Sequence, residues 1–180
     1  MKKFMSPLVI ALTLSTNTLP AASSSAASVQ PVAERYSKRL FQAVANNQMF
    51  EVSKLIKKGA NLLAQNEEGF TVLYLAVLHN NIECLNTIIL YAREKNILNE
   101  VLNAQTREWR QTPLHAAAAM DRKSCVRALL EAGANTTLKN GMGRTAAEHG
   151  RHNDYTELAM IIENYGKEPK QEKNKKCIIS

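Results

Sequence analysis

The cysteine four residues before the end of the sequence has the clearest potential for chemistry. Cys177 is followed by Ile178, Ile179 and Ser180, the C-a-a-X pattern in which a prenyl transferase alkylates the cysteine thiolate. Serine at the last position favours a farnesyl group. One lipid chain binds a membrane only marginally, so we expect the lysines of the basic tail, residues 167–180, to add attraction to an anionic membrane. The alternative is an unmodified apolar chain end.

The other reactive side-chain types do not occur at the spacing of a catalytic or metal site. Cys84, Cys125 and His115 have no partner placed to form a nucleophile–base pair or a zinc ligand set. No glycine-rich loop follows an apolar strand, as a phosphate-binding loop would. The sequence therefore predicts a protein that is not an enzyme and that holds no cofactor and no metal.

The first 28 residues have the order of a secretory signal peptide. Lys2 and Lys3 precede the apolar run Leu8–Leu14, and a stretch rich in serine and alanine follows. The run is shorter than the ~20 residues that span a bilayer. We expect residues 1–28 to be a leader, residues 29–33 to be a linker, and the chain to be exported from the producing cell. The alternative is a leader that is not a signal, or a short buried helix.

The formal charge of +7 lies mostly at the two ends of the chain. Residues 34–166 carry sixteen lysines and arginines against fourteen aspartates and glutamates. A nucleic-acid-binding domain concentrates its positive charge on the fold. This distribution argues against DNA or RNA as the partner.

The elements that position these residues are indicated by an internal repeat. Thr71, Thr112 and Thr145 open similar segments and are separated by 41 and 33 residues, so the first interval holds an insertion of eight. A Gly-Ala-Asn triplet, at residues 59–61 and again at residues 133–135, forms a second landmark in the same register. Two independent landmarks at one period indicate a repeat protein.

The segment Thr112-Pro113-Leu114-His115-Ala116-Ala117 resembles the ankyrin-repeat motif T-P-L-H-x-A. The resemblance covers residues 34–166 and implies an all-α solenoid of about four helix–turn–helix repeats with short hairpin-like tips. The outer repeats are degenerate, as capping repeats are. The repeats are placed at residues 34–66, 67–107, 108–140 and 141–166.

The motif chemistry supports helix pairs. Thr112 can cap a helix and Pro113 fits the first helical turn. Gly59 and Gly133 follow apolar helical runs and are expected in the left-handed conformation. By resemblance, His115 is a structural histidine that hydrogen-bonds within its repeat.

Three departures from the motif predict local differences. Arg110 replaces a turn glycine, so we expect a distorted tip. Ala147, His149 and Gly150 fall on the inner helix of the last repeat and predict a weak, frayed cap. The eight-residue insertion, within residues 90–105, is predicted to lengthen the second helix of its repeat.

Cys84 and Cys125 occupy the same repeat position, 13 residues after Thr71 and Thr112. Equivalent positions of stacked repeats lie roughly 10 Å apart, whereas a disulfide needs Cα atoms within about 7 Å. We expect two buried free thiols.

By resemblance, the binding face consists of the tips and the exposed ends of the first helices. Trp109 is the strongest candidate because tryptophan and arginine are common hot spots, and it lies between Arg107 and Arg110. Its alternative role is to cover the extended helix of the second repeat. The predicted partner-binding residues are Glu67, Glu68, Phe70, Leu78, His79, Trp109, Arg110, Gln111, Met120, Met142 and Arg144.

These features predict a monomeric, protein-binding adaptor. The chain is similar to ankyrin-repeat proteins that intracellular bacteria place in host cells, some of which end in a box that the host prenylates. That resemblance implies an exported effector held at host membranes by farnesylation of Cys177. The alternative is a non-lipidated periplasmic or secreted interaction module in which the box is accidental.

Overall fold

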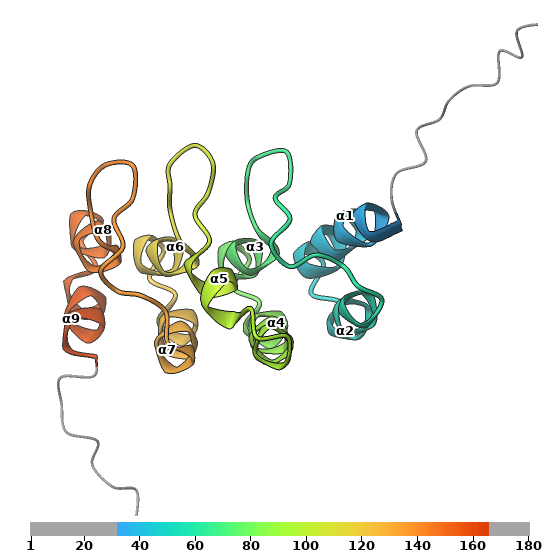
Figure 1. Cartoon of the computed structure of the whole chain (residues 1–180). Coiled ribbons are helices and arrows are strands. Elements are labelled where there is room, and N and C mark those ends of the chain that lie inside the picture. Colours follow the sequence, from blue (N-terminus) through green and yellow to red (C-terminus); the bar gives the residue numbers. More distant parts are fainter. Residues whose placement is uncertain (1–31, 166–180) are drawn as a thin grey trace, which may run out of the picture.

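Pairs of helices repeat along the chain, as the computed structural model of residues 32–165 shows (Figure 1). The first helices of the pairs lie in one row beside the tips, and the second helices lie in a row beneath them. The expected all-α class is confirmed, since these residues form helices with one isolated β-bridge, between Gln65 and Thr71. The helix pairs are α1 (Val32–Ala45) with α2 (Met49–Lys57), α3 (Val72–Leu78) with α4 (Ile82–Glu94), α6 (Pro113–Ala119) with α7 (Lys123–Ala132), and α8 (Ala146–His152) with α9 (Thr156–Asn164).

A threonine begins three of the four first helices. Thr71, Thr112 and Thr145 are extended N-cap residues, and each side-chain oxygen accepts a hydrogen bond from the backbone N–H three residues later, at 3.3, 3.4 and 3.3 Å. Such a bond satisfies one of the free N–H groups of the first turn. Pro113 follows in the first turn of α6, as predicted.

Left-handed residues end the helices at fixed repeat positions. Gly59 and Gly133 end the second helices with φ of 90° and 98°, which confirms the prediction. Asparagine or aspartate takes the same conformation between the two helices of every pair, since these residues tolerate it best after glycine. These turn residues are Asn47, Asn80, Asp121 and Asp154, with φ between 52° and 67°.

Both cysteines of the described region are completely buried and free, as expected. The Cys84 thiol donates to Oδ1 of Asn47 at 3.4 Å, and the Cys125 thiol donates to Oδ1 of Asn80 at 3.6 Å. Each thiol therefore contacts the turn of the preceding helix pair. Burial is the main cause that raises the pKa of both thiols, so they are held in the protonated, unreactive form.

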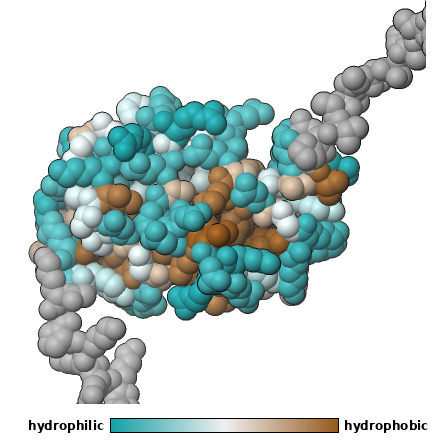
Figure 2. All heavy atoms as spheres, viewed as in Figure 1, coloured by the Kyte–Doolittle hydropathy of each residue, from teal (hydrophilic) through white to brown (hydrophobic). Residues whose placement is uncertain are grey.

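The prediction of one lengthened helix at the insertion is wrong. α4 ends at Glu94, Asn96 turns the chain with a φ of 57°, and a separate helix α5 (Leu98–Asn103) follows. The break lets Val101 and Leu102 return to the core, where both are buried. A continuous helix would have carried them away from it. Apolar residues gather beside α5 in the middle of the face shown in Figure 2.

The small residues of the last repeat allow close packing. A Cβ atom at Gly150 would lie 3.3 Å from the carbonyl oxygen of Ala118 in α6, so α8 approaches that backbone closely. Ala147 and His149 are buried in the same contact region. α8 and α9 form a helix pair like the others, and a weaker terminal repeat stays a prediction.

The predicted leader, residues 1–28, the basic residues 167–180 and the predicted lipidation residue Cys177 lie outside the described residues. Within residues 32–165, no helix combines the length and the apolar character needed to cross a bilayer.

Candidate functional site

Three loops that project beside the first helices form the candidate site (Figure 1). We define them as tip 1 (residues 64–70), tip 2 (residues 104–111) and tip 3 (residues 138–144). Backbone hydrogen bonds close tips 1 and 3 between residues four apart, at 3.0 and 2.9 Å. In tip 2 the closing bond joins Thr106 and Gln111, five apart, at 2.9 Å. Tip 2 is therefore distorted, as expected, and the distortion consists of one additional residue within the closed loop.

Arg110 takes the position that glycine holds in the other tips. Its φ is 49°, against 78° for Gly69 and 73° for Gly143. A side chain in this left-handed conformation costs roughly 1–2 kcal/mol. The chain therefore carries backbone strain at one exposed residue of tip 2.

A ladder of glutamine side chains connects the three tips. Nε2 of Gln65 donates to the carbonyl of Gln105 at 3.0 Å, and Nε2 of Gln105 donates to the carbonyls of Lys139 and Arg110, both at 3.0 Å. The Gly141 N–H also donates to the Trp109 carbonyl at 2.7 Å. The tips thus form one connected surface, which reduces the ordering cost of binding.

Buried side chains of the first helices hold tips 2 and 3 from below. The Tyr74 hydroxyl donates to Oε1 of Gln111 at 2.8 Å, and burial raises the Tyr74 pKa to about 12. Nε2 of His115 lies 3.0 Å from the Arg144 carbonyl, and its Nδ1 lies 2.7 Å from the Thr112 hydroxyl. A carbonyl can only accept, so Nε2 carries the proton and Nδ1 accepts.

This pattern confirms the structural role expected for His115 and extends it to the next repeat. Burial is the main cause that lowers the His115 pKa, and it outweighs the bond to Arg144, which raises it. His115 is therefore held neutral, as its two hydrogen bonds require.

The structure places the predicted binding residues in two groups. Seven are exposed, among them Trp109 at 52%, Met142 at 49% and Met120 at 43%. Phe70, Leu78, Gln111 and Arg144 are only partly exposed. The other exposed members are Glu67, Glu68, His79 and Arg110.

Two of the predicted residues also have structural contacts. The Phe70 ring stacks on Tyr74, with ring centroids 4.9 Å apart, and packs against the core. Gln111 accepts the Tyr74 hydroxyl. Trp109 keeps half of its surface in solvent, so it is not buried against the helices of the second repeat. Among the predicted binding residues, Trp109, Met120 and Met142 are therefore the large apolar side chains most available to a partner.

The glutamine ladder was not predicted from the sequence. Gln65 precedes Thr71 by six residues, whereas Gln105 precedes Thr112 by seven. The extra residue of tip 2 places the two glutamines out of register. The Gly-Ala-Asn landmark does not restore the register, because no such triplet precedes Gln105.

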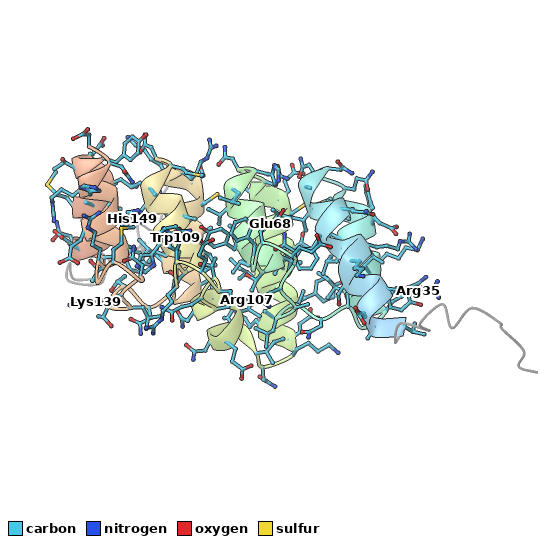
Figure 3. The ribbon with its side chains drawn as sticks, turned by 90° about the horizontal axis from the view of Figure 1, so that it is seen from above. Arg35, Glu68, Arg107, Trp109, Lys139 and His149 are labelled. Atoms are coloured by element: carbon cyan, nitrogen blue, oxygen red, sulfur yellow. The ribbon has the colours of Figure 1, made fainter. Side chains whose placement is uncertain are left out.

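The charges of the tips change sign along the array. Tip 1 carries Glu67 and Glu68, and tip 3 carries Lys139 and Arg144. Tip 2 carries two arginines and one glutamate, and therefore has a net charge of +1. Figure 3 shows Glu68, Arg107, Trp109 and Lys139 in that order along the array.

A groove continues the surface at its acidic end. It lies between α1 and tip 1, has a volume of about 610 Å³, and is lined by Phe41, Glu67 and Glu68 among others. Lys38 also lines it, with its ammonium 4.0 Å from the Glu34 carboxylate. No cluster of three metal-ligating side chains occurs among residues 32–165.

Two family models match the helix pairs just described. The model described as ankyrin repeats in many copies matches residues 40–89, and the single ankyrin-repeat model matches residues 109–141. These segments are ankyrin repeats. The expected resemblance is confirmed at this level, and ankyrin arrays act generally as protein-interaction modules.

Curated relatives share the repeats within much longer chains. The chain is 24% identical over 152 residues to a mitochondrial disaggregase of Bos taurus, covering 69% of this chain and 22% of that protein. It is 28% identical over 125 residues to diacylglycerol kinase zeta of Rattus norvegicus, covering 69% and 13%. It is 29% identical over 126 residues to dauer abnormal formation protein 25 of Caenorhabditis elegans, covering 70% and 31%. The chain thus spans less than a third of each of these relatives.

Proposed function

We propose that the three ankyrin tips bind a segment of a protein partner. The observation that carries this proposal is a connected, exposed row of tips with Trp109 on the middle one. Tryptophan and arginine dominate protein-binding hot spots, and Trp109 is flanked by Arg107 and Arg110. The strain at Arg110 supports the same conclusion, because strained residues gather at functional positions.

Chemistry at the described residues does not favour catalysis. Burial raises the pKa values of the two buried thiols and lowers those of the two buried imidazoles. All four groups are therefore favoured in their neutral forms. The kinase activity in the name of one relative belongs to a protein of which this chain matches 13%. A binding module is therefore the function that the repeats support best.

Replacement of Trp109 tests the proposal. The full chain serves as bait for a phage library of random nine-residue peptides, and the selected peptides are then measured against Trp109→Ala. We expect at least a tenfold loss of affinity, which is typical of a hot spot. Thermal stability should change little, since half of the side chain is already in solvent.

Phe50→Ala is the matched control, because Phe50 is 86% exposed on α2, away from the tips. It removes an aromatic ring that is even more exposed than Trp109 and should leave peptide binding unchanged. Equal affinity of the wild-type chain and Trp109→Ala for every selected peptide would contradict the proposal.

We also propose a location for this module, which rests on the two ends of the sequence alone. The signal-like residues 1–28 support export, and the C-a-a-X pattern at Cys177 supports farnesylation and anchoring of an exported effector at a host membrane. Expression in mammalian cells with a labelled isoprenoid tests the lipid. Absence of label, or unchanged membrane association of Cys177→Ser, would refute it.

The alternative is a periplasmic or secreted module without lipid. N-terminal sequencing and the intact mass of the mature protein distinguish the two proposals. A start near residues 22–28 together with an unmodified tail would favour the alternative.

A further inference from the structure

The tip surface has a polarity that restricts its partner, and this inference rests on the proposed binding function. Tip 1 is acidic, tip 3 is basic, and the exposed apolar side chains of Trp109 and Met142 lie on tips 2 and 3. The ladder from Gln65 through Gln105 to Lys139 fixes the order of these charges in space. A mobile surface could rearrange its charges to suit many partners, whereas a connected one cannot.

We propose that the tips bind an extended peptide segment whose charges are segregated, with a basic end over tip 1 and an acidic end over tip 3. An apolar side chain between the two ends packs on Trp109. Its basic residues face Glu67 and Glu68, and its acidic residues face Arg107 and Lys139, all of which are exposed.

The dimensions of the array set the length of this segment. Neighbouring helices pack about 8–10 Å apart, so tips 1 and 3 lie about 20 Å apart. About six residues of extended chain cover that distance at roughly 3.3 Å each. A segment of eight or nine residues therefore reaches both charged ends.

The groove beside tip 1 fits the basic end of such a segment. Phe41 is a partly buried lining residue, and Glu67 and Glu68 line the same groove. A lysine or arginine can lay its aliphatic stem on the apolar wall while its cation stays near carboxylates. Glu68 is itself held in place by a hydrogen bond from the Asn66 amide.

The same charge pattern disfavours other classes of partner. A nucleic acid carries uniform negative charge along its backbone. Such a polyanion would be attracted by tip 3 and repelled by Glu67 and Glu68 of tip 1. An anionic membrane would meet the same conflict, so a polar peptide is the ligand that all three tips match.

Three peptides of one composition test the polarity. Each is eight residues long and has capped ends, two lysines, two glutamates, a central leucine–phenylalanine pair and two glycine spacers. One begins with the lysines, one begins with the glutamates, and one alternates the charges. Titration of the full chain at low salt, followed by fluorescence anisotropy, should give one segregated order about a tenfold advantage over the alternating peptide, as four exposed ion pairs would supply. The advantage should fall above 0.1 M salt, where the screening length is about 10 Å.

A charge-reversed variant makes the test specific. Glu67→Lys, Glu68→Lys, Arg107→Glu and Lys139→Glu together reverse the surface, and the variant should prefer the opposite segregated peptide. Lys57→Glu with Glu131→Lys, exposed on α2 and α7, is the matched control and should keep the original preference. Circular dichroism shows that each variant is folded.

Each outcome separates the two proposals. Equal binding of all three peptides that is lost in Trp109→Ala would overturn the polarity and leave the proposed binding function intact. Binding of a single-stranded oligonucleotide or of phosphatidylserine vesicles that is lost in Lys139→Glu would overturn the peptide assignment. If neither these peptides nor library peptides depend on Trp109, both proposals fail.

Discussion

The buried histidine of the last repeat combines burial with an unsatisfied ring nitrogen. His149 is 7% exposed, and its buried Nδ1 has no hydrogen-bond partner. Its ring centroid lies 6.3 Å from that of His115, and Arg144 and His152 add positive potential. Burial is the main cause that lowers the His149 pKa, and the electrostatic contributions of Arg144 and then His152 lower it further. The fold therefore contains two histidines that resist protonation.

We expect the free energy of unfolding to decrease with acidification below about pH 6.5, the usual histidine pKa. The sign follows from linkage: the unfolded chain takes up protons at pH values where the folded His115 and His149 remain neutral. The contribution of these two neutral histidines to the free energy of unfolding is fully present above pH 6.5. It is lost as the pH falls towards their lowered pKa values. Urea denaturation at intervals from pH 7.5 to 5 measures the slope.

His149→Leu should flatten that slope and leave stability at pH 7.5 equal or higher, because it removes both the titration and an unpaired polar atom. His79→Gln, an exposed change at the end of α3 that does not touch the causes of the His149 shift, should retain the wild-type slope. An unchanged slope in His149→Leu would show that His149 does not contribute to the pH dependence.

Arg110 offers a test of strain at a single residue. Arg110→Gly should stabilise the fold by about 0.5–1 kcal/mol, which is the relief of the left-handed conformation less the added entropy of glycine in the unfolded chain. Peptide binding should weaken, because a charge of tip 2 is lost. Arg107→Gly is the control, since Arg107 is not among the residues with positive φ and gains no such relief. Destabilisation by Arg110→Gly would mean that its side chain supports tip 2.

At the scale of elements, close contacts between tips depend on glycine. A Cβ at Gly69 would lie 2.8 Å from the Cβ of Arg107, whereas one at Gly143 would meet nothing within 4 Å. Both glycines have positive φ. The two positions thus share a left-handed conformation that would strain any side chain, and they differ in the contact with the neighbouring tip.

Gly143→Ala should therefore cost about 1 kcal/mol, from the left-handed conformation alone. Gly69→Ala should cost about 1–3 kcal/mol more, since tips 1 and 2 must also separate. Chemical denaturation gives both values. Equal costs would indicate that the tips move apart freely, and the pre-organised surface proposed above would lose its basis.

At the scale of the molecule, each repeat contacts only its neighbours, so position in the array decides the effect of a core mutation. Ile88 and Ile162 occupy the same repeat position in α4 and α9 and are 0% and 2% exposed. Ile88→Ala should lower the stability of the whole array by about 2–5 kcal/mol.

Ile162→Ala should instead let α8 and α9 unfold ahead of the rest. Hydrogen exchange would show this as faster exchange in α8 and α9 with little change in α4, while Ile88→Ala would accelerate exchange throughout. A uniform response to both variants would contradict the independence of the terminal repeat.

The repeat period predicted the helix pairs because capping threonines, left-handed glycines and apolar spacing all act locally. Two features depended on contacts between repeats and could not be predicted in that way. α5 forms because Val101 and Leu102 find space in the core, and the glutamine ladder forms because the tips stack. The position of Trp109 was predicted, but its 52% exposure was decided by its neighbours.

The buried thiols also give the array its own chemical reporters. Cys84 contacts the turn of the first helix pair and Cys125 contacts the turn of the second. Each sulfur is therefore buried at a different contact between neighbouring repeats. A reagent can alkylate a buried cysteine only when the contact between its two helix pairs opens. In a Cys177→Ser variant, the labelling rates of Cys84 and Cys125 therefore measure how often two successive contacts between repeats open in the native protein.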